Sequence, residues 1–151
     1  MPEDVRLEAL RRVAARPALE AELVVMLADS NWNWSDEALS LVVRLDFRPS
    51  EGFVVTIHDA LMTMAGQLTT ASREVTFERD MWFDREASRR LTLALEVAEK
   101  IAVSTGADVR DAIDALVAAA SLFAGSDAER LFLSKAAETK ARIGAALIRS
   151  R

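Results

Sequence analysis

Apolar residues recur every three or four positions along most of this chain, and an unbroken stripe lies between positions 87 and 102. Its members are Ala87, Leu91, Ala94, Leu95, Ala98, Ile101 and Ala102. This spacing matches the 3.6-residue repeat of an α-helix rather than the two-residue repeat of a half-buried strand. With only 5 Gly and 3 Pro in 151 residues, little in the chain interrupts helices. The sequence therefore predicts an all-α fold.

Turn residues divide the chain into about seven predicted helices in antiparallel pairs. The first two cover residues 3–15 and 17–27, the third covers 36–47, the fourth follows Ser50 and carries its stripe to Leu68, the fifth runs from Asp84 to Gly106, the sixth follows Asp108, and the seventh starts at a capping box, Ser126 to Glu129. We expect a single domain over residues 1–151, built either as a HEAT-like solenoid fragment or as an irregular helical bundle.

Two tryptophans precede the third predicted helix. Ser35 is a natural N-cap, which makes Trp34 the residue before the cap. A large apolar residue there packs on the fourth helical residue, here Leu39, as a hydrophobic staple. Trp32 has no such local role, so it either covers the first helical hairpin or contacts a partner.

Residues 40–58 allow two interpretations. Valine, isoleucine and phenylalanine cluster on both sides of a turn that contains Pro49 and Gly52, a pattern typical of a β-hairpin. We favour helices because the apolar spacing continues in phase through Leu68, well beyond the length of a strand.

Residues 69–83 interrupt the helical pattern. The polar run Thr-Thr-Ala-Ser predicts a loop, whereas the apolar residues that follow are too numerous for a free linker. These residues are Val75, Phe77, Met81, Trp82 and Phe83. We expect a long connection that its aromatic side chains hold against the body of the protein.

Composition restricts the environment and the partners. The chain has no cysteine, so it needs no oxidising compartment, and no stretch approaches 18 uncharged apolar residues. We therefore expect a cytoplasmic protein without a membrane segment or an N-terminal signal peptide. A formal net charge of -5 disfavours nucleic acid as a partner.

Residues able to carry catalysis or bind a metal are scarce. His58 is the only histidine, and it borders the apolar stripe of the fourth predicted helix. Asp108, Asp111 and Asp114 recur every three residues, but capping and the helix dipole explain the first two. Glycine-rich phosphate loops are absent. We therefore predict a protein that is not an enzyme and has no catalytic residue, metal site or cofactor.

The last predicted helix is basic. Lys135, Arg142 and Arg149 recur at seven-residue spacing along one flank. Cations favour the C-terminal end of a helix and solvent, which explains the row without a function. The functional alternative is that these three side chains bind an acidic partner, and together with Trp32 they are the predicted partner-binding residues.

Two segments of the chain are similar to one another. Residues 4–15 and 108–119 share an Asp-Val-Arg start and a Val-Ala-Ala end. Each resembles the first helix of HEAT-like helical repeats, in which an Asp-x-Arg opening precedes a helix rich in alanine and leucine. The middle of the chain has no third clear copy and no constant period. The resemblance implies a non-enzymatic binding scaffold.

These patterns favour a helical interaction module that binds a protein partner or self-associates. The alternative is a ligand-sensing regulatory domain with an apolar pocket between helices. The side chains expected to line that pocket are Phe53, Met64, Phe77, Met81 and Trp82.

Overall fold

The structure is a computed structural model that describes residues 16–28, 32–45 and 48–149, with the backbone alone described for residues 16–17 and 32–34. Its helices are α2 (Arg16–Leu27), α3 (Trp32–Arg44), α4 (Glu51–Glu74), α5 (Arg79–Trp82), α6 (Ser88–Thr105), α7 (Arg110–Ala120) and α8 (Asp127–Arg149). A π-helical turn, Phe83–Ala87, joins α5 to α6, and a 3-10 turn, Ser121–Phe123, follows α7. No strand occurs in these residues, which confirms the all-α prediction.

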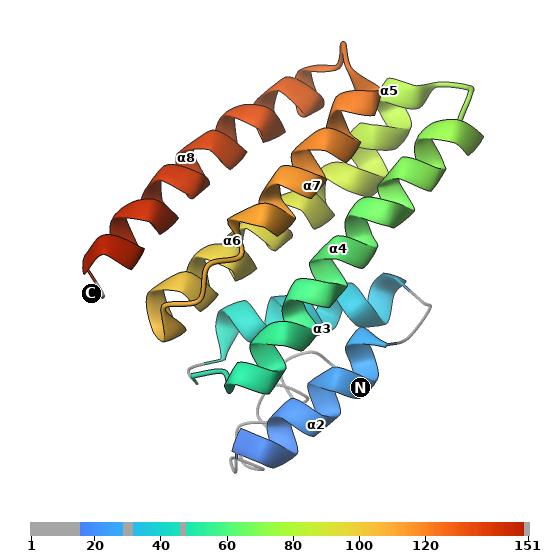
Figure 1. Ribbon diagram of the computed structural model, residues 1–151. Helices are drawn as coiled ribbons and strands as arrows, with labels where there is room; N and C mark the ends of the chain where they lie inside the picture. Colours follow the sequence, from blue (N-terminus) through green and yellow to red (C-terminus); the bar gives the residue numbers. More distant parts are fainter. Residues whose placement is uncertain (1–15, 29–31, 46–47, 150–151) are drawn as a thin grey trace.

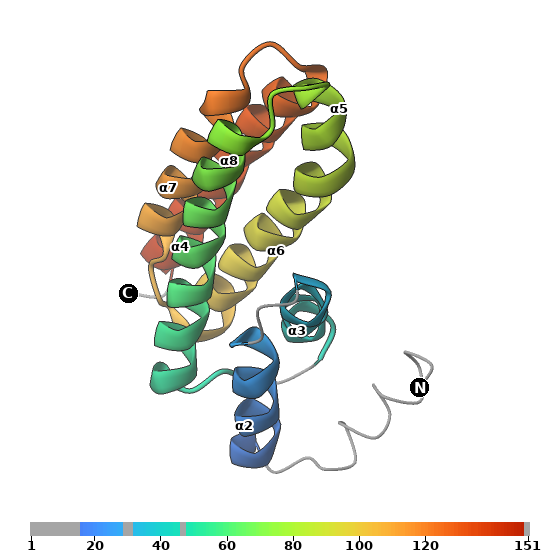
Figure 2. The same cartoon turned by 90° about the vertical axis from the view of Figure 1, so that its right-hand side faces the viewer.

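Four helices, α4, α6, α7 and α8, lie side by side as a bundle (Figure 1). The closest packing joins α6 to α8 and α4 to α7, so it does not follow the order of the helices along the chain. Near one end of this bundle, α3 contacts both α6 and α2. Figure 2 views α3 almost along its axis, which shows that it crosses the helices of this bundle steeply. This arrangement does not confirm a solenoid of stacked pairs.

The number of helices also differs in part from the prediction. Residues 79–105 form one continuous helical segment because α5, the π-helical turn and α6 follow one another without a break. The described residues therefore contain six helical segments. The first predicted helix, residues 3–15, lies outside the described residues, and so does the first of the two HEAT-like segments.

Helix α3 begins and ends earlier than predicted. It starts at Trp32 and ends at Arg44, so Ser35 lies inside the helix and is not its N-cap. The staple assignment of Trp34 as the residue before the cap is wrong for the same reason. Tryptophan and asparagine cost a helix little, so the first turn extends through them once other contacts hold α3 in place. The side chains of Trp32 and Trp34 lie outside the described residues, and their burial stays a prediction.

Within residues 40–58, α3 continues to Arg44 and α4 begins at Glu51, and no strand occurs among the residues described between them, so the helical interpretation is confirmed over the β-hairpin. Ser50 caps α4 as predicted: its Oγ accepts a hydrogen bond from the backbone N–H of Phe53 at 3.3 Å. The helix does not end near Leu68 but continues to Glu74. The hydroxyls of Thr69 and Ser72 donate to the carbonyls of Ala65 and Thr69 within α4, so this polar run is compatible with a helix.

The connection after α4 is therefore much shorter than predicted and covers only residues 75–78. Two of the aromatic side chains expected to hold this region against the protein do so, although they lie in the helical residues that follow the connection. Trp82 stacks on Phe123 with ring centroids 5.4 Å apart, and Phe83 is fully buried. Phe77 contradicts the prediction, because its side chain is 80% exposed.

The second half of the chain follows the predicted signals closely. Gly106 has a φ of 76° at the end of α6, the left-handed conformation that favours glycine there. The hydroxyl of Ser126 accepts a hydrogen bond from the backbone N–H of Glu129 at 3.0 Å. Asp108 accepts one from the backbone N–H of Arg110 at 3.1 Å, but it is not the N-cap that was predicted, because the N-cap of α7 is Val109. The seven residues of the stripe between 87 and 102 are all buried.

Candidate functional site

Two cations of α6 hold α3 at its two ends. Near its start, Asp36 accepts a hydrogen bond at 2.8 Å from Nε of Arg90, whose residue is only 8% exposed. Near its end, Nζ of Lys100 donates to the backbone carbonyls of Val43, at 3.1 Å, and of Leu45. A cation at the last carbonyls of a helix complements the negative end of the helix dipole. These contacts position α3 across α6.

A groove lies between α3, α6 and α8, and we call it the α3–α6–α8 groove. Its volume is about 990 Å³, and its lining carries five acidic and four basic side chains. They are Asp36, Glu37, Asp84, Glu96 and Asp127, and Arg44, Arg89, Arg90 and Lys135. The apolar lining includes Leu131, which is 56% exposed. The groove therefore combines charges of both signs with an accessible leucine.

A second hollow of about 460 Å³ adjoins this groove, and we call it the acidic hollow. Both are lined by Asp84, Asp127 and Ala128. The acidic hollow adds Asp80 and Met81 of α5, and none of its lining residues is basic. The two hollows thus form one surface feature with an acidic end near α5.

The three basic side chains predicted to form one row on α8, Lys135, Arg142 and Arg149, have different surroundings. Lys135 lines the α3–α6–α8 groove. Arg142 instead forms an ion pair with Glu99 of α6 and donates a hydrogen bond to the hydroxyl of Thr139 at 3.2 Å. The hydrogen bond to Glu99 raises the pKa of the Arg142 guanidinium above its ordinary value. Arg149 is exposed in the last turn of α8.

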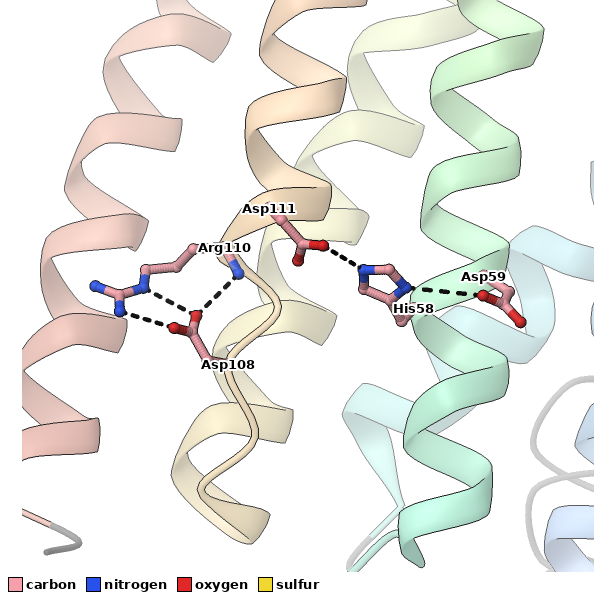
Figure 3. A network of polar contacts seen from close by, with 5 residues as sticks. All are labelled: His58, Asp59, Asp108, Arg110 and Asp111. Atoms are coloured by element: carbon pink, nitrogen blue, oxygen red, sulfur yellow. Dashed lines mark hydrogen bonds and ion pairs between the residues drawn. The ribbon is translucent and has the colours of Figure 1, made fainter.

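His58 lies between two carboxylates on the surface formed by α4 and α7 (Figure 3). Its Nε2 is 2.8 Å from Oδ2 of Asp111, and its Nδ1 is 3.8 Å from Oδ1 of Asp59. The Asp111 contact joins α4 to α7 and orients the ring. His58 lines neither the α3–α6–α8 groove nor the acidic hollow. The sequence did not indicate this contact, because its two partners lie far apart in the chain.

The three evenly spaced aspartates near the start of α7 point to three different partners. Asp108 pairs with Arg110 at 2.8 Å, Asp111 with His58, and Asp114 with Lys140 of α8. The hydrogen bond from Arg110 lowers the pKa of Asp108 below its ordinary value. Within the described ranges, no group of three or more histidine and acidic side chains converges on a position for a metal ion.

The side chains predicted to line an apolar pocket do not share one. Phe53 and Met64 are buried in the core, whereas Phe77 is exposed at the turn between α4 and α5. The cavity that Met64 and Trp82 line has a volume of only about 10 Å³, far below the few hundred needed for a small ligand. Met81 lines the acidic hollow instead.

Comparisons with protein-family models, with curated proteins and with solved structures found no match to this chain. Among the described residues, no helix has both the length and the apolar character to cross a membrane. Any functional inference therefore depends on the groove, the acidic hollow and the His58 contacts.

Proposed function

We propose that this protein is a non-enzymatic interaction module of the cytosol, which binds a protein partner or a second copy of itself through the α3–α6–α8 groove. The observation that carries this proposal is the accessible side chain of Leu131 in a groove of about 990 Å³. A groove that surrounds an accessible apolar side chain with charged ones is compatible with a partner surface, because protein interfaces combine an apolar centre with a polar rim. The HEAT-like resemblance of residues 108–119 implies the same class of function.

The chemistry of the groove favours protein over the other classes of partner. Small-molecule sites are mostly apolar, with a few convergent polar groups, whereas this groove carries nine charged side chains from three helices. Nucleic acid would bring phosphates against five carboxylates, and the whole chain already has a net charge of -5. A protein surface can match charges of both signs along such a groove.

Lys135 is the predicted partner-binding residue that this proposal supports most directly, because it lines the groove. Arg142 is already bound to Glu99, so its charge is less available to a partner. Arg149 stays a predicted contact outside the groove lining, and Trp32, whose side chain lies outside the described residues, stays a predicted contact as well.

The proposal is tested by placing a photo-crosslinking amino acid at position 131 and expressing this variant in the source cell. Val103 of α6 provides the control position. Its side chain is apolar and exposed, like that of Leu131, but it lies outside the groove. We expect one discrete cross-linked species from position 131 and none from position 103. Mass spectrometry of that species identifies either a partner or a second copy of the chain.

A variant with one reversed charge tests whether the groove itself binds the partner. Lys135→Glu reverses one charge of the groove wall at an exposed position. It should change the yield of the cross-link from position 131, upward for a basic partner segment and downward for an acidic one, without altering the melting temperature. Equal cross-linking from positions 131 and 103, or cross-linking unchanged by Lys135→Glu, would contradict the groove as the binding surface.

A further inference from the structure

The acidic hollow extends the proposed interaction surface and indicates the chemistry of the partner. Within the described part of the chain, the carboxylates of Asp80 and Asp84 have no hydrogen-bond or ion-pair partner. Asp127, by contrast, pairs with Arg130. Two neighbouring carboxylates without counter-charges therefore lie at one end of the surface, where a cation would be attracted to both.

Part of the positive charge in the adjoining groove is already committed to the fold. Arg90 is buried and pairs with Asp36, so one base of the lining is already neutralised within the fold. Arg89 and Lys135 are exposed basic side chains of the lining. The charge asymmetry is therefore greatest toward the acidic hollow, whose lining has no base.

Apolar side chains are accessible in both parts of this surface. Met81 is 43% exposed in the acidic hollow, and Leu131 is exposed in the groove. Asp84 and Asp127 line both parts, so carboxylates lie between the two apolar positions. An amphipathic helix offers the matching pattern, because it presents apolar anchors on one face and charges beside them.

We propose that the segment bound by this surface is a basic amphipathic α-helix, with Leu131 and Met81 contacting its apolar face and Asp80 and Asp84 pairing with its lysines or arginines. This inference rests on the proposed interaction function and specifies the partner's chemistry. Methionine suits such a site because its flexible side chain adapts to different apolar surfaces.

The test uses two synthetic amphipathic peptides of about 18 residues, long enough to be helical when bound. One contains leucine and lysine, and the other has the same leucines with glutamate in place of every lysine. Binding of each fluorescently labelled peptide to the full chain is measured by anisotropy. We expect the lysine peptide to bind, more weakly at high salt, and the glutamate peptide not to bind.

Two charge-matched variants separate a specific site from general attraction to an acidic protein. Asp84→Lys should raise the Kd of the lysine peptide about tenfold or more, because it places a like charge in the acidic hollow. Asp59→Lys makes the same charge change at an exposed position on α4 outside this surface, and it should change the Kd little. Leu131→Gln, which removes an apolar contact without adding charge, should also weaken binding.

Equal Kd values for the two peptides, or equal effects of Asp84→Lys and Asp59→Lys, would overturn the inference. The cross-linking experiment distinguishes this failure from failure of the proposed function. A protein captured at position 131 through an acidic segment would support the interaction function and refute the basic helix. Absence of any cross-link would refute the interaction function itself.

Discussion

Phe77 and Phe83 are chemically identical and lie close in sequence, yet their surroundings are opposite. Phe83 is fully buried with its ring centroid 5.2 Å from that of Phe123, whereas Phe77 projects into solvent. Phe83→Ala should therefore lower the free energy of unfolding by about 3–5 kcal/mol, because it leaves a cavity in the core. Phe77→Ser should change it by less than about 0.5 kcal/mol. Chemical denaturation measures both, and similar losses would show that Phe77 packs against the protein.

Helix α3 depends on side chains from another helix for its position. Arg90 and Asp36 form an ion pair in which the arginine is buried, so removing the carboxylate takes the opposite charge away from a buried guanidinium. We expect Asp36→Ala to lower the free energy of unfolding by about 2 kcal/mol, less than for a fully buried pair because Asp36 is partly exposed. Hydrogen exchange of the α3 amides should also accelerate.

A surface ion pair between two helices supplies the control for this prediction. Asp114 of α7 pairs with Lys140 of α8, and the side chains of both are at least a third exposed. Asp114→Ala should cost less than about 1 kcal/mol, because solvent screens exposed pairs. Equal losses for Asp36→Ala and Asp114→Ala would contradict the special role assigned to Arg90.

The described helices share one apolar core. Buried apolar side chains form a single cluster that extends from Leu19 of α2 to Ile143 of α8. We therefore expect the chain to unfold in one cooperative transition, with circular dichroism and tryptophan fluorescence giving the same midpoint. Trp82 belongs to α5, whereas Trp32 and Trp34 belong to α3. A variant that keeps only Trp82 therefore reports unfolding near α5, and a variant that keeps only Trp32 and Trp34 reports unfolding of α3. Two distinct midpoints would show that α2 and α3 unfold independently.

Helix positions could be predicted where the signals act within a few residues. Ser50, Gly106 and Ser126 each act at a helix end through their own neighbouring backbone, and all three predictions were confirmed. The errors arose where local signals conflict. The polar run from Thr69 indicated a loop, but hydroxyl groups that bond to carbonyls of their own helix remain compatible with it.

The candidate site was much less accessible to prediction. Lys135 was identified as a possible contact, but the groove that it lines needs α3, α6 and α8 at one place. One signal was present: Arg90 falls on the apolar stripe of α6, between Ala87 and Ala94, where a charge requires a buried partner. The sequence could not name Asp36 as that partner.

Periodicity and caps thus establish an all-α chain and most of its helix boundaries, because hydrogen bonding and apolar spacing are local properties of the backbone. The packing of the helices, in contrast, depends on contacts between residues that are distant in the sequence. The steep crossing of α3 depends on contacts such as Arg90 with Asp36 and Lys100 with Val43, whose partners lie more than fifty residues apart in the sequence. The groove and the acidic hollow exist only through that packing, since no single helix contains either of them.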